Sequence, residues 1–194
     1  MNPPLYKTRT DLERIACEAM RERGLESDFS TAVVRQLASI TGAGSDSGPL
    51  VQDRTHLLWC SIDNDDSMDL DQLTACEVLD GGKVRIFVAI ADVDALVRKG
   101  SAIYEFAHTT TTSIYTSARI FPMLPERLST DLTSLNPDVD RLAVVVEMLI
   151  QADAAIGPST VYRARVRNQA KLAYDAVSAW MDGKAVPPAA VAAL

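Results

Sequence analysis

Five aspartates fall within nine residues, between positions 63 and 71, directly after an apolar run. The segment reads Asp63-Asn64-Asp65-Asp66-Ser67-Met68-Asp69-Leu70-Asp71, and Gln72 follows it. Carboxylates this close together repel one another, so a fold that gathers them needs a compensating charge. A hard divalent cation can supply that charge, because Mg²⁺ and Mn²⁺ prefer oxygen ligands. On composition alone, a solvated acidic loop that binds no metal explains the segment equally well.

The spacing of these aspartates excludes one kind of metal loop and permits another. An EF-hand that started at Asp63 would place Met68 where glycine is required and Thr74 where a bidentate glutamate is required. A strand that ends at Asp63 and a returning loop with Asp69 and Asp71 can instead converge on cations about 3.5–4 Å apart. Such a pair of cations stabilises the attacking and leaving oxygens of phosphodiester hydrolysis. Spacing permits this chemistry without proving it.

The amino-acid composition excludes several other classes of protein and of metal site. The 194 residues are 47% apolar and 23% charged, which is typical of one ordinary globular domain. The net charge of −7 means that a cleft for phosphates would have to be locally basic. The three cysteines form no C-x-x-C pair and only two histidines are present, so neither a zinc site nor a disulfide framework is indicated. With no signal-peptide core and no apolar run near ~20 residues, we expect a cytoplasmic protein without a membrane partner.

Two further features could contact a nucleic acid. Arg163, Arg165 and Arg167 alternate, so in a strand they would share one face and could follow a phosphate backbone. The solvated outer face of an edge strand explains them equally well. Tyr115 lies in an extended segment and could stack on a base, although an isolated tyrosine more commonly serves packing.

Apolar periodicity and turn residues predict the elements. We expect two N-terminal helices, the first with a capping box at Thr10 and an end at Gly24, the second capped by Ser30 with Val34 among its inward residues. A flexible linker over 41–49 should separate this helical extension, residues 1–48, from a domain over 49–194. The further elements are strands at 57–62, 73–79, 84–91, 142–151 and 159–167, an extended segment at 113–121, and helices at 101–109, after Pro125, at 170–181 and from 186 onward.

Several motifs, in order from about residue 55 to 182, resemble the RNB-domain exoribonucleases of the ribonuclease II and ribonuclease R family. Ser61-Ile62-Asp63 and Asp69-Leu70-Asp71 resemble the family's T-I-D and D-x-D-D. Further matches are Val88-Ala89-Ile90-Ala91-Asp92, Thr112-Ser113-Ile114-Tyr115, Phe121-Pro122-Met123-Leu124-Pro125, Leu128-Ser129, Ser134-Leu135-Asn136-Pro137, Asp140-Arg141 and Ala170-Lys171-Leu172-Ala173-Tyr174. The resemblance implies an α+β fold: a mixed, mainly antiparallel sheet with packed helices, preceded by a short helical pair.

The resemblance also implies an activity and the roles of particular residues. Members of the family hydrolyse single-stranded RNA from the 3′ end with Mg²⁺ and release nucleoside 5′-monophosphates. Asp63, Asp69 and Asp71 would hold the metal, with Mn²⁺ as a possible substitute for Mg²⁺, and Asp71 would be the most essential to catalysis. Tyr115 matches the aromatic residue that stacks on the 3′-terminal nucleotide. Single-stranded RNA is therefore the expected partner, with no DNA specificity.

The chain departs from the family pattern in two ways. Gln72 replaces the fourth aspartate, and its amide offers one oxygen ligand without a charge. The match covers only about the first half of the catalytic domain, so we expect a fragment of a longer enzyme or a truncated gene product. The alternative function is therefore a non-catalytic RNA-binding or vestigial RNB module.

Overall fold

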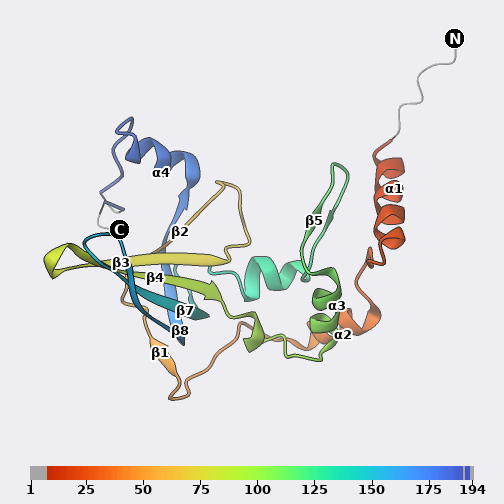
Figure 1. Cartoon of the computed structure of the whole chain (residues 1–194). Helices are drawn as coiled ribbons and strands as arrows, with labels where there is room; N and C mark the ends of the chain where they lie inside the picture. Colours follow the sequence, from red (N-terminus) through yellow and green to blue (C-terminus); the bar gives the residue numbers. More distant parts are fainter. Residues whose placement is uncertain (1–7, 190, 193–194) are drawn as a thin grey trace, which may run out of the picture. The chain divides into compact units, whose positions relative to one another are not determined.

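The computed structural model describes residues 8–189 and 191–192, which form two compact units (Figure 1). One unit, the helical unit, comprises residues 1–41 and 97–126, and the other, the barrel unit, comprises residues 42–96 and 127–194. The first boundary falls at the start of the expected linker. The division into an extension over 1–48 and a domain over 49–194 stays a prediction, because the helical unit also takes in residues 97–126.

The barrel unit is built around one mixed sheet of six strands. Its strands are β1 (Val51–Asp53), β2 (Trp59–Asp63), β3 (Gln72–Leu79), β4 (Lys83–Ala91), β7 (Asp140–Ile150) and β8 (Ile156–Ala173). Antiparallel pairings run from β2 through β3, β4 and β7 to β8, and β8 returns to pair in parallel with β2. These pairings close a ring of five strands, and β1 adds to β8 in parallel. The predicted mixed, mainly antiparallel α+β fold is confirmed.

Strand β8 closes the ring because it is long enough to serve two neighbours. Residues up to Arg167 pair with β7, and residues from Asn168 onward pair with β2. The register shifts between Trp59 and Cys60, opposite the start of this second half. The strand expected over 159–167 is thus confirmed and extended. The helix expected from residue 170 is wrong in its start, because residues 170–173 continue β8 and α4 spans only Tyr174–Met181.

Alternating side chains fill the centre of the ring. On β3 Leu73 and Ala75 are buried between exposed neighbours, and on β8 Ala164 and Val166 are buried in the same way. A period of two places every second side chain on one face of a strand, and here that face is the core. The largest core side chains, Trp59 and Phe87, pack edge to face with ring centroids 6.1 Å apart.

The remaining elements of the barrel unit are short connections. The turn Asp80–Gly82 joins β3 to β4, as the sequence predicts, and Gly81 has a positive φ of 71° there. A one-turn helix spans Val93–Ala95, and a π-helix over Arg127–Leu132 follows Pro125. The helix expected from residue 186 onward is not found in residues 186–189 and 191–192. Its remaining positions lie outside the described residues.

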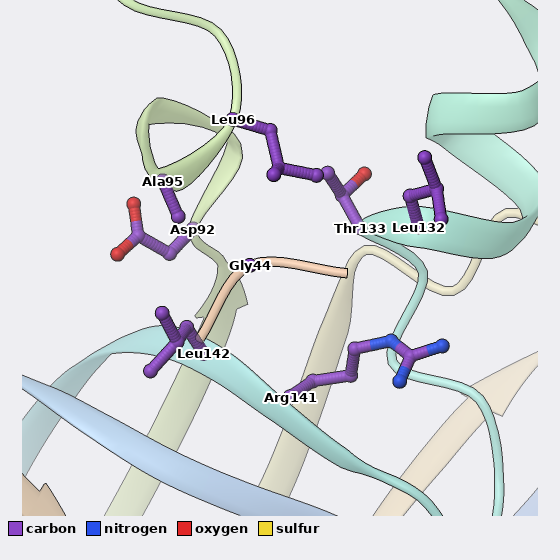
Figure 2. Close-up of a pocket in the computed structure, with 8 residues that line it drawn as sticks. All are labelled: Gly44, Asp92, Ala95, Leu96, Leu132, Thr133, Arg141 and Leu142. Carbon is purple, nitrogen blue, oxygen red and sulfur yellow. The ribbon is translucent and has the colours of Figure 1, made fainter. Parts of the chain in front are cut away.

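The linker predicted to be flexible packs against the barrel unit. A Cβ added to Gly44 would come within 2.8 Å of the Ala95 Cβ, so only glycine fits there. Gly44 borders a cavity of about 10 Å³ that is also lined by Leu96 and Leu142 (Figure 2). That volume accommodates at most one water molecule, so the cavity is a packing gap and not a ligand site.

The helical unit contains α1 (Arg9–Glu22), α2 (Thr31–Ser39), α3 (Ala102–Thr110) and the hairpin of β5 (Ile114–Tyr115) and β6 (Ile120–Phe121). Ser30 and Ser101 cap α2 and α3 as predicted. The capping box of α1 lies at Thr8 and Asp11 instead of Thr10, and Val34 is 56% exposed instead of buried. None of the helices among the described residues is both long and apolar enough to span a membrane.

Candidate metal centre

Asp63 is the last residue of β2, and its carboxylate stabilises the turn that follows. Its Oδ1 accepts hydrogen bonds from the Asn64 backbone N–H at 2.7 Å and from the Ser67 hydroxyl at 2.9 Å. From the parallel strand β8, the Lys171 ammonium group donates to the Asp65 backbone oxygen at 2.9 Å. The acidic loop is therefore ordered by local hydrogen bonds at the point where the strand ends.

Asp69 and Asp71 flank a residue that the fold fixes on both sides. Leu70 is 2% exposed, whereas Asp69 and Asp71 are exposed. The Ser134 hydroxyl accepts a hydrogen bond from the Leu70 N–H at 3.0 Å, and the Leu70 oxygen accepts one from the Leu135 N–H at 2.9 Å. The two carboxylates are therefore exposed on either side of one buried and anchored residue.

The charge of this cluster is not balanced by nearby cations. Burial raises the pKa of Asp71, and the negative charges of Asp69 and Asp63 raise it further. Asp71 keeps contact with solvent, but the surrounding chain removes enough water to disfavour its charged form. Within the described residues, no ion pair neutralises any of these three aspartates. An uncompensated group of carboxylates is what a cation would stabilise.

The donor chemistry of the three aspartates fits a hard divalent cation, because they offer only carboxylate oxygens. Their side chains are not yet arranged for coordination: among residues 8–189 and 191–192, no three His, Cys, Asp or Glu side chains form a group that could hold a metal ion. Binding of an ion would therefore require the three carboxylates to turn toward a common point. Asp63 would have to exchange its bonds from Asn64 and Ser67 for the ion, whereas the anchors at Leu70 involve only backbone groups of that segment.

Gln72 lies beside the aspartates in the barrel unit, whereas Tyr115 lies in the helical unit. Gln72 is the first residue of β3, next to Asp71, and is exposed opposite Ile90 of β4. Tyr115 belongs to the helical unit, where it pairs with Ile120 in the hairpin and is 70% exposed. A tyrosine that exposes its ring this far is available for stacking and is not needed for packing.

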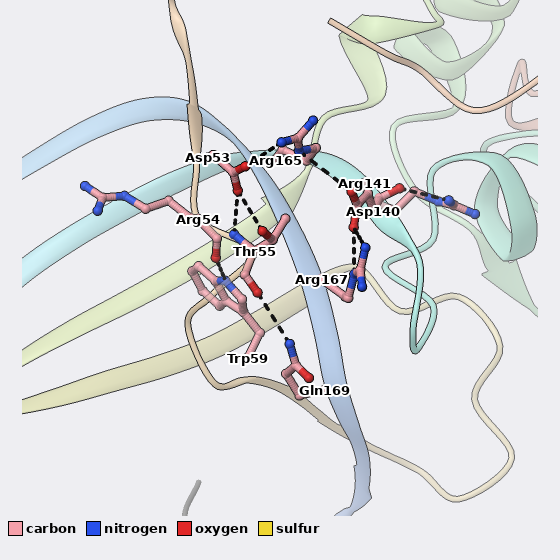
Figure 3. A network of polar contacts seen from close by, with 9 residues as sticks. All are labelled: Asp53, Arg54, Thr55, Trp59, Asp140, Arg141, Arg165, Arg167 and Gln169. Carbon is pink, nitrogen blue, oxygen red and sulfur yellow. Dashed lines mark hydrogen bonds and ion pairs between the residues drawn. The ribbon is translucent and has the colours of Figure 1, made fainter. Parts of the chain in front are cut away.

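Acidic side chains neutralise the arginine strip on β8, which the sequence offered as a phosphate track. Arg165 pairs with Asp53, directly opposite on β1, and Arg167 pairs with Asp140 on β7 at 2.7 Å (Figure 3). Arg163 binds Asp92 at 2.6 Å. The strip also does not lie on an edge strand, because β8 has partners on both sides. In this structure, the arginines form ion pairs with neighbouring strands and loops and so stabilise the sheet.

Comparison with known proteins places the chain in a family. The profile of the RNB domain matches residues 51–193. The chain belongs to the RNB-domain family. Ribonuclease R of Vibrio parahaemolyticus is 35% identical over 166 residues, which are 85% of this chain and 20% of the relative. Exoribonuclease 2 of Cronobacter sakazakii is 39% identical over 134 residues, 69% of this chain and 21% of the relative. This RNB chain thus spans about a fifth of the length of these relatives.

Solved structures agree with this assignment. Mycoplasma genitalium RNase R in complex with ribose-methylated single-stranded RNA superposes on this RNB chain with a TM-score of 0.79 at 28% identity. The match covers 90% of this chain and 28% of that one. The resemblance inferred from the sequence motifs is therefore confirmed at the level of family and fold.

Sequence reasoning missed the residues that hold the aspartates in place. Ser134 was noticed only as part of a matching motif, and Asn168 was not noticed at all. Asn168 is 1% exposed and lies on the core face of β8, two residues after the buried Val166. A polar residue at a core-facing position of a strand is the signal that could have identified it.

Proposed function

We propose that this chain carries the metal-binding aspartates of a 3′-to-5′ hydrolytic exoribonuclease that degrades single-stranded RNA to nucleoside 5′-monophosphates. The observation that carries the proposal is the anchored Asp69-Leu70-Asp71 segment, in which the pKa of Asp71 is raised by burial and by the charges of Asp69 and Asp63. Membership of a family whose relatives include proteins named ribonuclease R and exoribonuclease 2 supports it. A cytoplasmic location, expected from the cysteine usage, is part of the same proposal.

Asp63, Asp69 and Asp71 would hold Mg²⁺, with Mn²⁺ as the alternative ion, because all three offer hard oxygen donors. The bound ion supplies an activated water and positive charge at the scissile phosphate. The protein supplies position: the bonds from Ser134 and Leu135 fix the backbone between two of the ligands. Asp71 must be ionised to bind the cation, so its raised pKa means that binding requires a higher pH than an ordinary aspartate would.

Tyr115 would stack on the base of the 3′-terminal nucleotide and so limit how short the final product becomes. Its 70% exposure supports this role, since aromatic faces open to solvent are the usual platforms for single-stranded nucleic acids. We expect no DNA specificity and no membrane partner.

A non-catalytic RNA-binding module is the second candidate, and Gln72 is the observation that favours it. An amide at this position adds no negative charge to the cluster, which weakens the attraction for a divalent cation. The two candidates make opposite predictions for a simple assay of the 194-residue chain with end-labelled single-stranded RNA and Mg²⁺. Shortened products that disappear in Asp71→Asn support the exonuclease. Retention of RNA without cleavage supports the binding module.

A further inference from the structure

Three buried polar side chains lie between the two segments that carry the candidate metal ligands. Ser61 and Ser134 are each 2% exposed, and Asn168 is 1% exposed. Ser61 lies two residues before Asp63 on β2, whereas Ser134 follows the π-helix and Asn168 lies on β8. Buried polar groups destabilise a fold unless they are hydrogen-bonded. The partners of these three side chains therefore show what they do.

Asn168 bonds simultaneously to three parts of the barrel unit. Its Nδ2 donates to the Ser61 hydroxyl at 3.1 Å and to the Leu135 backbone oxygen at 3.0 Å. Its Oδ1 accepts from the Ala170 N–H at 3.1 Å, near the register shift between β2 and β8. A side-chain amide donates twice and accepts at one site, which neither a hydroxyl nor a carboxylate can do. The position therefore requires an amide.

The segment that Asn168 holds is the one that anchors Leu70. Leu135, whose oxygen binds Asn168, donates its own N–H to the Leu70 oxygen at 2.9 Å. The adjacent Ser134 hydroxyl accepts from the Leu70 N–H at 3.0 Å and can donate its single proton to the Met68 oxygen, also 3.0 Å away. Both backbone groups of Leu70 are thus bound by two consecutive residues.

We propose that Asn168 and Ser134 are positioning residues that set Asp69 and Asp71 relative to Asp63. The connection runs from the Ser61 side chain through the Asn168 amide and the Leu135 backbone to Leu70, between the two aspartates. Every member of this connection is at most 2% exposed, so Asn168 and Ser134 would act through the ligands and not by contact with metal or substrate. The inference rests on the proposed function, since it assigns these residues to the metal site proposed there. Partners that orient metal ligands typically contribute about 10–100-fold to metal affinity or activity.

The decisive variants are Asn168→Ala and Ser134→Ala in the 194-residue chain. Each should weaken Mn²⁺ binding, measured by calorimetry, by about tenfold or more, and lower kcat on single-stranded RNA similarly with KM changed less than about twofold. In Asn168→Ala the Leu135 N–H should also exchange with solvent faster, because the bond on the other side of that peptide segment is lost. A purely structural role would lower the melting temperature without these selective effects.

Three further variants make the comparison specific. Thr133→Val removes a buried hydroxyl that donates to the Leu128 oxygen at 2.9 Å, one residue from Ser134. It should lower stability while metal affinity stays within about twofold of wild type. Ser61→Thr keeps the hydroxyl that accepts from Asn168 and should retain metal binding, whereas Ser61→Ala should not. If Asn168→Ala does not fold, Ser134→Ala and the Ser61 pair decide the question.

The results separate this proposal from the proposed function. Metal affinity and Leu135 exchange that are unchanged in folded Asn168→Ala and Ser134→Ala would overturn the positioning role alone. A wild-type chain that binds no Mn²⁺ would overturn both the metal site and its supports. Equal losses of metal affinity in Thr133→Val and Ser134→Ala would also overturn it, because they would show a general response to lost stability.

Discussion

The acidic segment over residues 63–71 and the arginine strip over residues 163–167 meet opposite surroundings in the barrel unit. Each arginine of the strip has an aspartate partner, on a neighbouring strand or in a connecting loop. Asp63, Asp69 and Asp71 have no cationic partner among the described residues, and their mutual repulsion contributes to the raised pKa of Asp71. Paired charges hold strands together, whereas unpaired charges that the fold holds in place at a cost in stability mark a candidate functional site.

This contrast also explains why the density of charge alone misleads. The alternation of three arginines predicted a shared face correctly, but not that acidic residues distant in sequence would neutralise that face. Asp53 lies more than a hundred residues before its partner Arg165. The following predictions test the contrast, from the largest expected effect to the smallest.

Asp71→Asn should have the largest effect, and its two consequences should have opposite signs. Loss of a charged ligand should lower RNA cleavage by about 10³-fold, since a metal-assisted step contributes several kcal/mol.

The same change should increase thermal stability at pH 7. The folded-state pKa of Asp71 is raised, so its ionisation destabilises the fold progressively as pH rises above the ordinary aspartate pKa, and the loss is complete above the raised pKa. Below the ordinary aspartate pKa the stability difference should vanish, which melting curves at several pH values would show. A variant less stable than wild type at pH 7 would contradict this.

Arg163→Met tests the paired segment where its partner is most buried. The Asp92 side chain is 4% exposed, so removal of Arg163 leaves a charge without its main partner in the protein interior. Because Arg163 itself is 35% exposed, we expect a loss of about 2–3 kcal/mol in the free energy of unfolding, less than for a fully buried pair. Urea denaturation measures this. If RNA affinity instead falls strongly while the free energy of unfolding is unchanged, the arginine strip binds phosphates and does not serve mainly to hold the fold together.

Gln72→Asp should strengthen the unpaired segment. A fourth carboxylate next to Asp71 would increase the attraction for Mg²⁺ by about tenfold at low ionic strength, and cleavage should rise with it. Thr74→Asp is the matched control, since Thr74 is the next exposed position on β3 and gains the same charge. If both variants raise metal affinity equally, the gain reflects net charge and not a ligand at position 72.

Arg165→Ala should have the smallest effect. Arg165 and Asp53 are 45% and 55% exposed, so their ion pair should contribute less than about 1 kcal/mol to the free energy of unfolding. RNA affinity should stay within about twofold of wild type at moderate salt, measured by filter binding. A larger loss of affinity, with a shallower salt dependence, would show that the arginine leaves Asp53 to bind phosphate.

The sequence predicted most helices and strands because their signals are local. Strand-like segments located β3 and β4, two glycines located the turn between them, and Ser30 and Ser101 located two helix starts in the helical unit. The start of α4 was missed because residues 170–173 are good helix formers, yet pairing with β2 draws them into β8. Tertiary pairing overrode local propensity there.

The candidate site was predicted only in part, for a physical reason. Aspartate density and the family motifs identified Asp63, Asp69 and Asp71, and their roles as metal ligands stay predictions. The hydrogen bonds that anchor them come from Ser134 and Asn168, more than sixty residues further along the chain. Such contacts depend on the closure of the ring by β8, so a local pattern can mark Asn168 as a buried polar residue but cannot identify its distant partners.

The central claim is that Asp63, Asp69 and Asp71 bind a divalent cation as a set. Calorimetric titration of the 194-residue chain with Mn²⁺ tests it most directly, with Asp63→Ala as the variant and Asp66→Ala as a control that removes an equal charge from the same loop. We predict that wild type and Asp66→Ala bind the ion within about twofold of each other, and that Asp63→Ala binds at least about tenfold more weakly. Binding that is unaffected by Asp63→Ala would contradict the account.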